Sequence, residues 1–202
     1  MEGSPVSRPP SPRPRRADAA LNRVRILAAA RALFAERGSA VQLPEIARAA
    51  GVGIGTVYRH FPTQADLIEA AAAQRFAEIE DFARTECLRA EPGEGLARYL
   101  RHVGEVLTAD RGLSAAIEAA RQSAGSAPRG ESRSRLEEVI GELVERDRAA
   151  GMVREDCTVT DVYMIVGAMS ATIGSGSGDW RRLVEIVLDG LRPGAAGRRS
   201  NE

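Results

Sequence analysis

One stretch of 19 residues constrains the fold of this chain more than any other feature: LPEIARAAGVGIGTVYRHF, residues 43–61. Pro44 suits the first turn of a helix, where its missing N–H costs no hydrogen bond, and apolar residues then recur at helical spacing (Ile46, Ala47 and Ala50). Gly51 can adopt the positive φ that ends a helix, and a second helix is expected from about Ile54. Two short helices joined by a glycine turn predict a helix-turn-helix, whose second helix has the right size for the major groove of DNA.

The second helix of this motif divides into an inner and an outer face. Val57 and Phe61, four residues apart, are expected to face inward. The outer face then carries Thr56, Tyr58, Arg59 and His60. Arg59 is predicted to read a base, because a guanidinium can bond the edge of guanine bidentately; a phosphate contact alone is the alternative. At the other three positions a contact with DNA has an alternative: a core position for Tyr58 or His60, and a merely tolerated helix position for Thr56.

The composition favours packed helices over a sheet. Aromatic residues make up 4% of the 202 residues, and alternating patterns that a helix does not explain better are short. We therefore expect an all-α protein of about nine helices. Besides the two motif helices, these are predicted over residues 18–37, 64–89, 94–109, 113–123, 132–150, 159–173 and 179–191. At about 1.5 Å per residue, the helix from residue 64 is long enough to connect one compact unit to another.

Composition and charge divide the chain into four parts. These are an Arg/Pro-rich arm expected to be disordered, a DNA-binding unit with its motif at 42–61, a helical body and a flexible tail, over residues 1–17, 18–80, 81–192 and 193–202. The chain is neutral overall, but residues 1–62 carry ten arginines against four acids. A basic front end on an acidic body indicates that the first part meets a polyanion. The arm is either a DNA-contacting segment or a solvated leader; both stay open.

Other function classes find little support in the sequence. Cys87 and Cys157 lie far apart, and no Cys/His cluster occurs at ligand spacing, so neither a metal nor a cofactor is expected. The absence of a nucleophile–base pair and of a phosphate-binding glycine loop argues against an enzyme. No secretory signal or membrane-length apolar run is found, which predicts a cytoplasmic protein with reduced thiols and no membrane partner.

Residues spread over positions 20–80 carry a family resemblance. They keep their order and gaps, and include Arg23, Ile26-Leu27, Ala29-Ala30, Leu33-Phe34, Gly38, Ile46-Ala47, Ala49 to Val52, Gly55 to Tyr58, His60-Phe61 and Leu67. In this region the chain resembles the tetracycline-repressor-like (TetR) family of bacterial transcriptional regulators. Beyond residue 80 the similarity is limited to the helical layout, the link at 151–162 and the ending at 188–193.

The resemblance implies a homodimer with a three-helix DNA-binding unit, a ligand pocket in the helical body and double-stranded operator DNA as partner. Position by position, it assigns DNA contacts to Arg23, Leu43, Pro44, Gly53, Ile54, Gly55, Thr56, Tyr58, Arg59, His60 and Gln64. Gln64 departs from the family pattern, since a neutral amide replaces a phosphate-binding lysine. Gln42 replaces a Ser or Thr cap, so the motif's first helix is expected to be weakly capped. Gly53 and Ile54 replace a common Ser-Lys pair and make the recognition helix less basic.

Pocket and dimer residues are assigned from side-chain type and helical spacing. Aromatic and sulfur-containing side chains are more often core than ligand contacts, but together they can wall an adaptable cavity. The candidates for the pocket are Phe76, Tyr99, His102, Arg121, Tyr163, Met164, Met169 and Ser170. A wide apolar stripe on the last helix is expected at the dimer interface, with packing inside one chain as the alternative: Val184, Val187, Leu188 and Leu191.

These observations predict a sequence-specific DNA-binding transcriptional regulator. The favoured mechanism is a homodimeric repressor that leaves a palindromic operator when a small-molecule effector binds and the helix from residue 64 tilts. An activator would share the same features. The alternatives from other classes are a helical enzyme that kept a vestigial DNA-binding unit and a non-specific nucleoid-type protein. The acidic body argues against the second.

Overall fold

The computed structural model describes residues 13–194, with side chains from residue 17 onward. Every regular element in that range is helical, which confirms the all-α prediction. The α-helices are α1 (Arg13–Arg37), α2 (Leu43–Ala50), α3 (Ile54–His60), α4 (Gln64–Phe82), α5 (Gly95–Ala109), α6 (Arg111–Arg121), α7 (Gly130–Ala149), α8 (Val159–Ser175) and α9 (Trp180–Gly190). A 3-10 turn, η1 (Gly38–Ala40), follows α1, and a π turn, η2 (Ala83–Cys87), follows α4. Each of these described helices is too short or too polar to traverse a bilayer.

Helix α1 begins earlier than the sequence predicted. It starts at Arg13 rather than Asp18, because Pro14 lies in the first turn, where a proline needs no N–H partner. Residues 13–17, which were predicted to belong to the disordered arm, are therefore part of α1. The remaining part of the arm, residues 1–12, lies outside the described residues, as does most of the predicted tail, residues 195–202.

The long helix predicted over residues 64–89 consists of α4 and the π turn η2. Its N-terminus has the predicted reciprocal cap: Thr63 Oγ1 accepts a hydrogen bond from the Asp66 N–H (3.1 Å), and the Asp66 carboxylate accepts one from the Thr63 N–H (3.0 Å). At the other end the Leu88 N–H donates to the Ala83 carbonyl oxygen (2.9 Å), five residues back, which is the π pattern.

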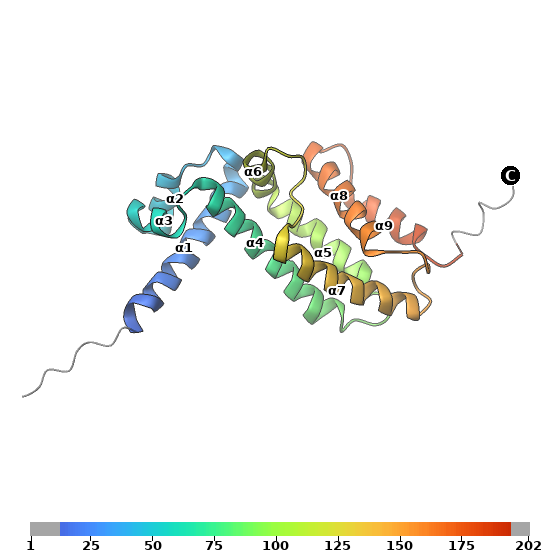
Figure 1. Cartoon of the computed structure of the whole chain (residues 1–202). Helices are drawn as coiled ribbons and strands as arrows, with labels where there is room; N and C mark the ends of the chain where they lie inside the picture. Colours follow the sequence, from blue (N-terminus) through green and yellow to red (C-terminus); the bar gives the residue numbers. More distant parts are fainter. Residues whose placement is uncertain (1–12, 195–202) are drawn as a thin grey trace, which may run out of the picture.

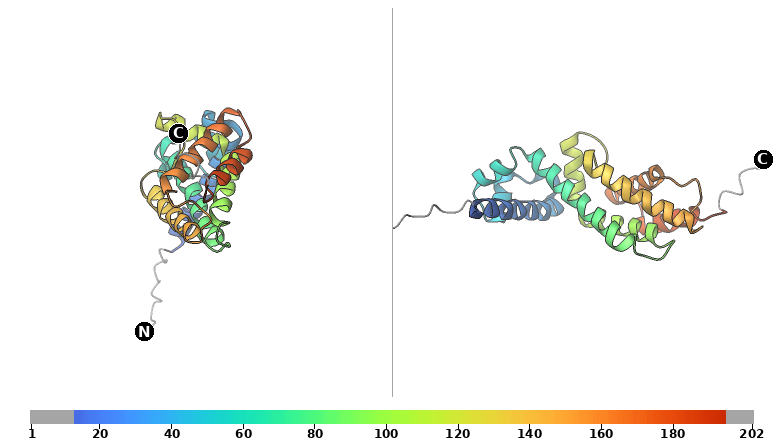
Figure 2. Two further views of the ribbon diagram at one scale, coloured as in Figure 1. Left: turned by 90° about the vertical axis from the view of Figure 1, so that its right-hand side faces the viewer. Right: turned by 60° about the horizontal axis from the view of Figure 1, so that its bottom comes forward.

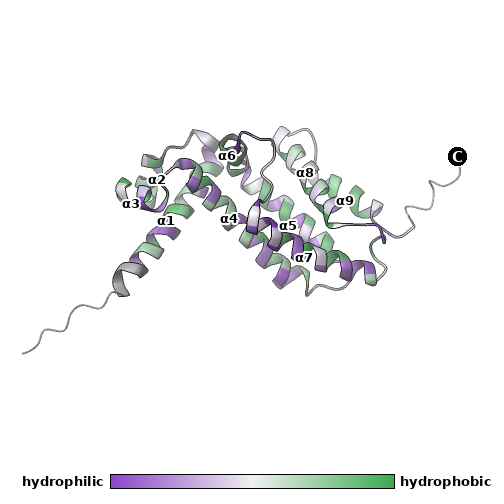
Figure 3. Ribbon diagram, viewed as in Figure 1, coloured by the Kyte–Doolittle hydropathy of each residue, from purple (hydrophilic) through white to green (hydrophobic). Residues whose placement is uncertain are grey.

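The molecule is elongated, with α1–α3 at one end and α5, α7, α8 and α9 at the other (Figure 1). Helix α4 runs from the first group into the second, and α6 lies between them (Figure 1, Figure 2). Hydrophobic and hydrophilic bands alternate along the body helices, as expected for amphipathic helices that share a core (Figure 3). Buried apolar side chains form one continuous cluster from Ile26 in α1 to Val184 in α9, so the two ends are packed together rather than tethered.

Helix α1 meets the body at a close contact that we call the α1–α6 seam, formed by Arg31, Phe34, Glu78, Asp110 and Gly112. Arg31 of α1 donates two hydrogen bonds to Glu78 of α4 (2.6 and 2.7 Å) and one to Asp110, just before α6 (2.9 Å). A Cβ atom at Gly112 of α6 would lie 1.8 Å from the Phe34 carbonyl oxygen of α1. A movement of α6 against α1 must therefore break ion pairs and shift closely packed backbone.

A buried carboxylate positions the start of α5. Asp147 of α7 is fully buried, and its two oxygens accept hydrogen bonds from the Gly93 N–H (3.0 Å) and the Leu96 N–H (3.1 Å). Gly93 has φ +90°, which favours glycine and turns the chain into α5. The carboxylate thus supplies an acceptor that the first N–H groups of α5 lack within the helix.

Candidate DNA-binding surface and ligand cavity

The turn between α2 and α3 has the predicted geometry. Gly51 has φ +66°, the left-handed conformation, and the Val52 N–H donates back into α2 (3.0 Å). At the start of α2, the Glu45 carboxylate accepts a hydrogen bond from the Gln42 N–H (3.0 Å) and pairs with Arg37 (2.6 Å). Glu45 therefore holds the first turn of α2 and offsets the weak cap that we predicted from Gln42.

Helix α3 lies at the end of the molecule opposite α9 (Figure 1). The inward side chains of Val57 and Phe61 are buried. The exposed or partly exposed side chains are those of Ile54, Thr56, Tyr58, Arg59 and His60. Val57 and Phe61 hold α3 against the core of the protein. The opposite face of α3 is therefore free to contact another molecule.

The first turns of α2 and α3 differ in what they expose. A Cβ atom at Gly53 or Gly55 would touch no atom within 4 Å, so packing inside the chain does not require glycine at either position. These residues leave open space beside the α3 backbone, where a duplex can approach closely. In α2 the Pro44 ring is exposed, but the Leu43 side chain is buried in the core. A DNA contact of Leu43 is therefore limited to its backbone, because the first turn of α2 points its side chain inward.

Two residues predicted to contact DNA also make contacts inside the protein. The Arg23 guanidinium lies over the Phe61 ring, 4.6 Å from its centroid, so a cation–π contact holds it beside α3. The Gln64 Nε2 donates to the Val41 carbonyl oxygen (2.8 Å), which ties the start of α4 to the segment before α2. Gln64 thus links two segments of the protein. The sequence alone indicated only that Gln64 replaces a phosphate-binding lysine and did not predict this link.

Exposed arginines give this end of the molecule its positive charge. They are Arg23, Arg25, Arg48 and Arg59, and none of them makes an ion pair within the described part of the chain. By contrast, Arg31 and Arg37 are paired with carboxylates. Guanidinium groups that are exposed beside a groove-sized helix attract backbone phosphates and can bond base edges. The arrangement is that of a nucleic-acid interface.

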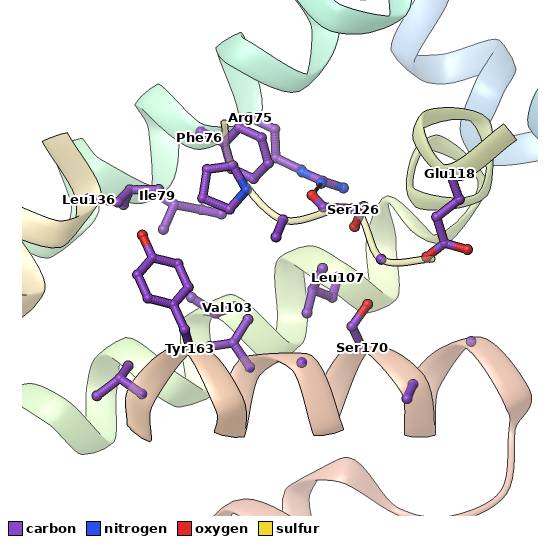
Figure 4. Close-up of a pocket in the computed structure, with 18 of the residues that line it drawn as sticks. Arg75, Phe76, Ile79, Val103, Leu107, Glu118, Ser126, Leu136, Tyr163 and Ser170 are labelled. Atoms are coloured by element: carbon purple, nitrogen blue, oxygen red, sulfur yellow. Dashed lines mark hydrogen bonds between the residues drawn. The ribbon is translucent and has the colours of Figure 1, made fainter. Parts of the chain in front are cut away.

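A cavity of about 550 Å³ lies inside the body. Helices α4, α5, α7 and α8 form its walls, together with the loop at 124–128 that follows α6 (Figure 4). Its lining is largely apolar and includes Phe76, Ile79, Val103, Leu107, Leu136 and Ile140. A cavity of this size and character suits a drug-sized ligand.

The cavity divides the predicted pocket residues into two sets. Those that line it are Phe76, Tyr99, Tyr163 and Ser170. His102 instead stacks on the ring at the end of α4 (centroids 3.7 Å apart), and Arg121 pairs with Glu69 (2.7 Å). Met164 is 67% exposed at the surface, whereas Met169 is buried in the core. These last four predicted residues are therefore not among those that line this cavity.

The apolar stripe on α9 lies partly in the core of its own chain, and its role in a dimer stays a prediction. Val184 is buried in the core of its own chain, and Val187, Leu188 and Leu191 are half-buried against that core. Packing within one chain therefore accounts for much of the stripe. The large apolar side chains that α8 and α9 leave exposed are Met164 and Ile186, which the sequence reasoning did not place at an interface.

Sequence reasoning missed the positively charged group of the cavity, Arg75 of α4. Its side chain is fully buried; Nη1 donates to Ser114 Oγ (3.0 Å), and Nη2 donates to the Ser126 carbonyl oxygen (3.2 Å). Burial lowers the pKa of Arg75 to about 10, so the guanidinium stays protonated at neutral pH. The signal was in the spacing: Leu67, Ala71 and Arg75 follow at intervals of four, which puts an arginine in the buried stripe of α4.

The remaining polar groups of the cavity are mostly uncharged. Burial raises the pKa of Tyr163 to about 12 and also raises the pKa of Tyr99, so both phenols stay neutral. Ser170 adds a hydroxyl, and Glu118 adds a carboxylate at the end of the cavity next to α6 (Figure 4). The cavity can therefore hold an apolar body and offers few polar contacts to orient it.

Comparison with known proteins finds relatives for both ends of the chain. The family described as "Bacterial regulatory proteins, tetR family" matches residues 26–71. The family described as "Transcriptional regulator SbtR-like, C-terminal domain" matches residues 91–193. The HTH-type transcriptional repressor KstR of Rhodococcus jostii (strain RHA1) is 30% identical over 177 residues, which cover 83% of this chain and 81% of that repressor.

Solved structures agree with these relatives. A TetR transcription regulatory protein from Mycobacterium vanbaalenii is 38% identical, with a TM-score of 0.65 over 89% of this chain and 99% of that one. A TetR transcriptional regulator from Streptomyces coelicolor is 37% identical, with a TM-score of 0.66 over 85% of this chain and 99% of that one. The similarity thus extends over the α3 surface, the cavity and the helices between them.

Proposed function

The chain belongs to the TetR family of bacterial regulatory proteins and is a DNA-binding transcriptional regulator, and on this premise we propose that it is a ligand-responsive repressor. In this proposal a homodimer binds a palindromic operator through its two α3 helices and releases it when a small molecule fills the cavity. No catalytic step is assigned to the chain. The observation that carries the proposal is that α4 bonds to the DNA-binding end through Gln64 and lines the cavity through Arg75, Phe76 and Ile79.

On the DNA side, α3 enters the major groove with its exposed face. Arg59 reads a base edge, and Arg23, held over the Phe61 ring, adds a cation for a nearby phosphate. The remaining proposed contacts are to phosphates from Thr56, Tyr58 and His60, and to the groove floor from Gly53, Ile54 and Gly55, with Pro44 and Gln64 at the margin.

The dimer interface is proposed on the outward faces of α8 and α9. Met164 and Ile186 are the large apolar side chains exposed there, and the small exposed residues Ala168 and Ala171 continue the Met164 face along α8. A second copy packed on this surface buries them, with Leu188 at its edge. The two-fold pair then reads two half-sites about 34–36 Å apart.

The response to ligand passes along α4 and across the α1–α6 seam. Gln64 and Arg75 lie on one helix, about 16 Å apart along its axis at 1.5 Å per residue. A ligand that favours a different packing of α4 therefore also moves the segment bonded to Gln64 and, with it, α2 and α3. The ligand acts only through its different affinity for the two packings, which in allosteric proteins amounts to about 1–3 kcal/mol.

Binding of promoter DNA tests the recognition role. We expect Arg59→Ala to weaken binding to the DNA upstream of the protein's own gene by about 5- to 150-fold, since a bidentate base contact contributes about 1–3 kcal/mol. The measurement is fluorescence anisotropy in the presence of random competitor DNA. Arg98→Met, which removes an exposed arginine of α5 paired with Glu94 (3.0 Å), is the matched control and should bind like the wild type.

Two outcomes would contradict the proposal. If Arg59→Ala kept both the affinity and the selectivity of the wild type, α3 would not be the reading helix. If the protein remained a monomer in light scattering at the concentrations used for DNA binding, the paired half-site model would fail. De-repression of a reporter after deletion of the gene would support repression, whereas lower expression would indicate an activator.

A further inference from the structure

Arg75 is a fully buried cation in the wall of an apolar cavity, and the protein uses only part of its bonding capacity. A guanidinium carries five N–H groups. One bonds Ser114 Oγ and one bonds the Ser126 carbonyl oxygen, while the Nε group is buried with no partner in the described part of the chain. Both partners are neutral, and the Phe76 ring, whose centroid lies 5.0 Å from the guanidinium carbon, adds a cation–π contact but no negative charge.

No carboxylate within residues 17–194 forms an ion pair with Arg75. Asp110 acts on it electrostatically, but the Asp110 carboxylate is already paired with Arg31 (2.9 Å). Arg121 is also near enough to repel the charge, and it is paired with Glu69. A buried charge without a counter-ion is costly, because no opposite charge offsets the loss of its hydration. Stability alone therefore does not account for an arginine here.

From this arrangement, and resting on the proposed ligand-responsive function, we infer that the effector is an apolar organic acid whose anionic group binds Arg75. A neutral acceptor could fill the unused N–H groups, but it would leave the charge uncompensated. An anion completes both the hydrogen bonds and the charge. Figure 4 shows the Arg75 guanidinium beside Ser126 in the wall of the cavity.

The rest of the lining specifies the other parts of the molecule. The apolar walls around Phe76, Val103 and Leu136 bind a hydrophobic body. Glu118 lies at the end of the cavity next to α6 and repels a second negative charge there (Figure 4). The expected ligand has one anionic group at Arg75 and an uncharged remainder.

The same guanidinium also connects the cavity to the α1–α6 seam. Ser114 lies on α6, two residues after Gly112, and Ser126 lies in the loop that follows this helix. An anion that binds the unused N–H groups also pulls the Arg75 guanidinium away from Ser114 and Ser126. Binding of the acid therefore loosens the hold of α4 on α6, the helix packed against α1. In this inference the Arg75 side chain both binds the anionic group of the effector and transmits its binding to the DNA-binding end of the protein.

A pair of dyes tests the inference without knowledge of the natural effector. Anilinonaphthalene sulfonate is an apolar anion, and N-phenylnaphthylamine is the same aromatic framework without the charged group. Fluorescence titration of the full chain should show that the anion binds the wild type at least tenfold more tightly than Arg75→Met, since hydrogen bonds to a charged group contribute about 1.5–3 kcal/mol, or about 10- to 150-fold. The neutral dye should bind both proteins equally.

Two further variants keep the test interpretable. Arg75→Lys retains the charge and should keep a measurable preference for the anionic dye, which a merely structural role would not predict. Arg98→Met removes an exposed arginine outside the cavity and should leave both titrations unchanged. Thermal unfolding of each variant establishes that it is folded, and the wild-type comparison of the two dyes holds even if Arg75→Met does not fold.

The outcomes decide between distinct failures. Equal effects of Arg75→Met on both dyes, unchanged binding of the anion, or no preference of the wild type for the anion would each overturn the inference. If operator binding by the same preparation persisted in that case, the proposed repressor function would stand and only the effector class would be wrong. If the anion bound through Arg75 but promoter DNA did not bind, the repressor function would fail instead.

Discussion

Gly112→Ala probes the α1–α6 seam with a single methyl group. The added Cβ would lie 1.8 Å from the Phe34 carbonyl oxygen, 2.8 Å from its carbonyl carbon and 3.0 Å from the Ala35 carbonyl oxygen. An ordinary C···O contact is about 3.3 Å or longer, so α6 must withdraw by about 1.5 Å. All three atoms belong to the backbone of α1, and no rotamer change can relieve the clash.

The expected cost follows from this overpacking. Inserting a methyl group into a closely packed site costs about 1–3 kcal/mol, and the better helix propensity of alanine recovers less than about 1 kcal/mol. We therefore expect Gly112→Ala to lower the free energy of unfolding by a net of about 0.5–2.5 kcal/mol and the Tm by about 1–10 °C for a chain of this size. The assay is thermal and urea unfolding followed by circular dichroism at 222 nm, the usual α-helix band, at about micromolar concentration.

Gly141→Ala is the matched control within α7. The nearest atom to its added Cβ is Val159 Cγ2 at 3.8 Å, an ordinary contact. Here the lost flexibility of the unfolded chain dominates, and stability should rise by about 0.5–1 kcal/mol. If Gly112→Ala unfolded at or above the wild-type temperature while Gly141→Ala behaved as expected, the close contact of α6 with α1 would be refuted.

Two further predictions concern a buried carboxylate and a half-buried histidine. Asp147→Ala should lower the free energy of unfolding by about 2–4 kcal/mol in urea titrations, since two backbone N–H groups lose a charged acceptor; an unchanged urea midpoint would contradict this role. Burial lowers the pKa of His102 below 6.5, so the folded state binds fewer protons than the unfolded state and stability falls as the pH drops through 6.5. His102→Phe keeps a ring beside Phe82 and should lose less Tm than the wild type between about pH 7.5 and pH 5.5, whereas equal losses would exclude His102 as a source of acid sensitivity.

The helix-turn-helix could be predicted from the sequence because its signals are local. Pro44, Gly51 and the spacing of Val57 and Phe61 act within one or two turns of backbone, and the structure places each of them as expected. The capping pair at Thr63 is equally local. The same holds for the division of α3 into an inner and an outer face.

The cavity required information that helical periodicity does not contain. A period of 3.6 residues shows which side chains share a face, but not which neighbour covers that face. Tyr99 and His102 both lie on α5, yet α4, α7 and α8 enclose the first around a cavity while the second stacks on the α4 ring of Phe82. The apolar stripe of α9 could likewise not be divided between its own core and a second copy.

The sequence by itself determined the motif, the helical class and the family, because these depend on short-range backbone preferences and on an ordered set of residues. Only the tertiary structure decided whether a charged side chain is buried or exposed and whether it has a counter-ion. Arg75 and Arg98 are both helical arginines, but packing of α6 and its following loop buries the first without a counter-ion, while the second remains exposed beside Glu94. Whether a side chain is buried depends on elements that are distant in the chain. Burial removes the hydration of a charged group, which costs several kcal/mol, about the largest single effect on such a group.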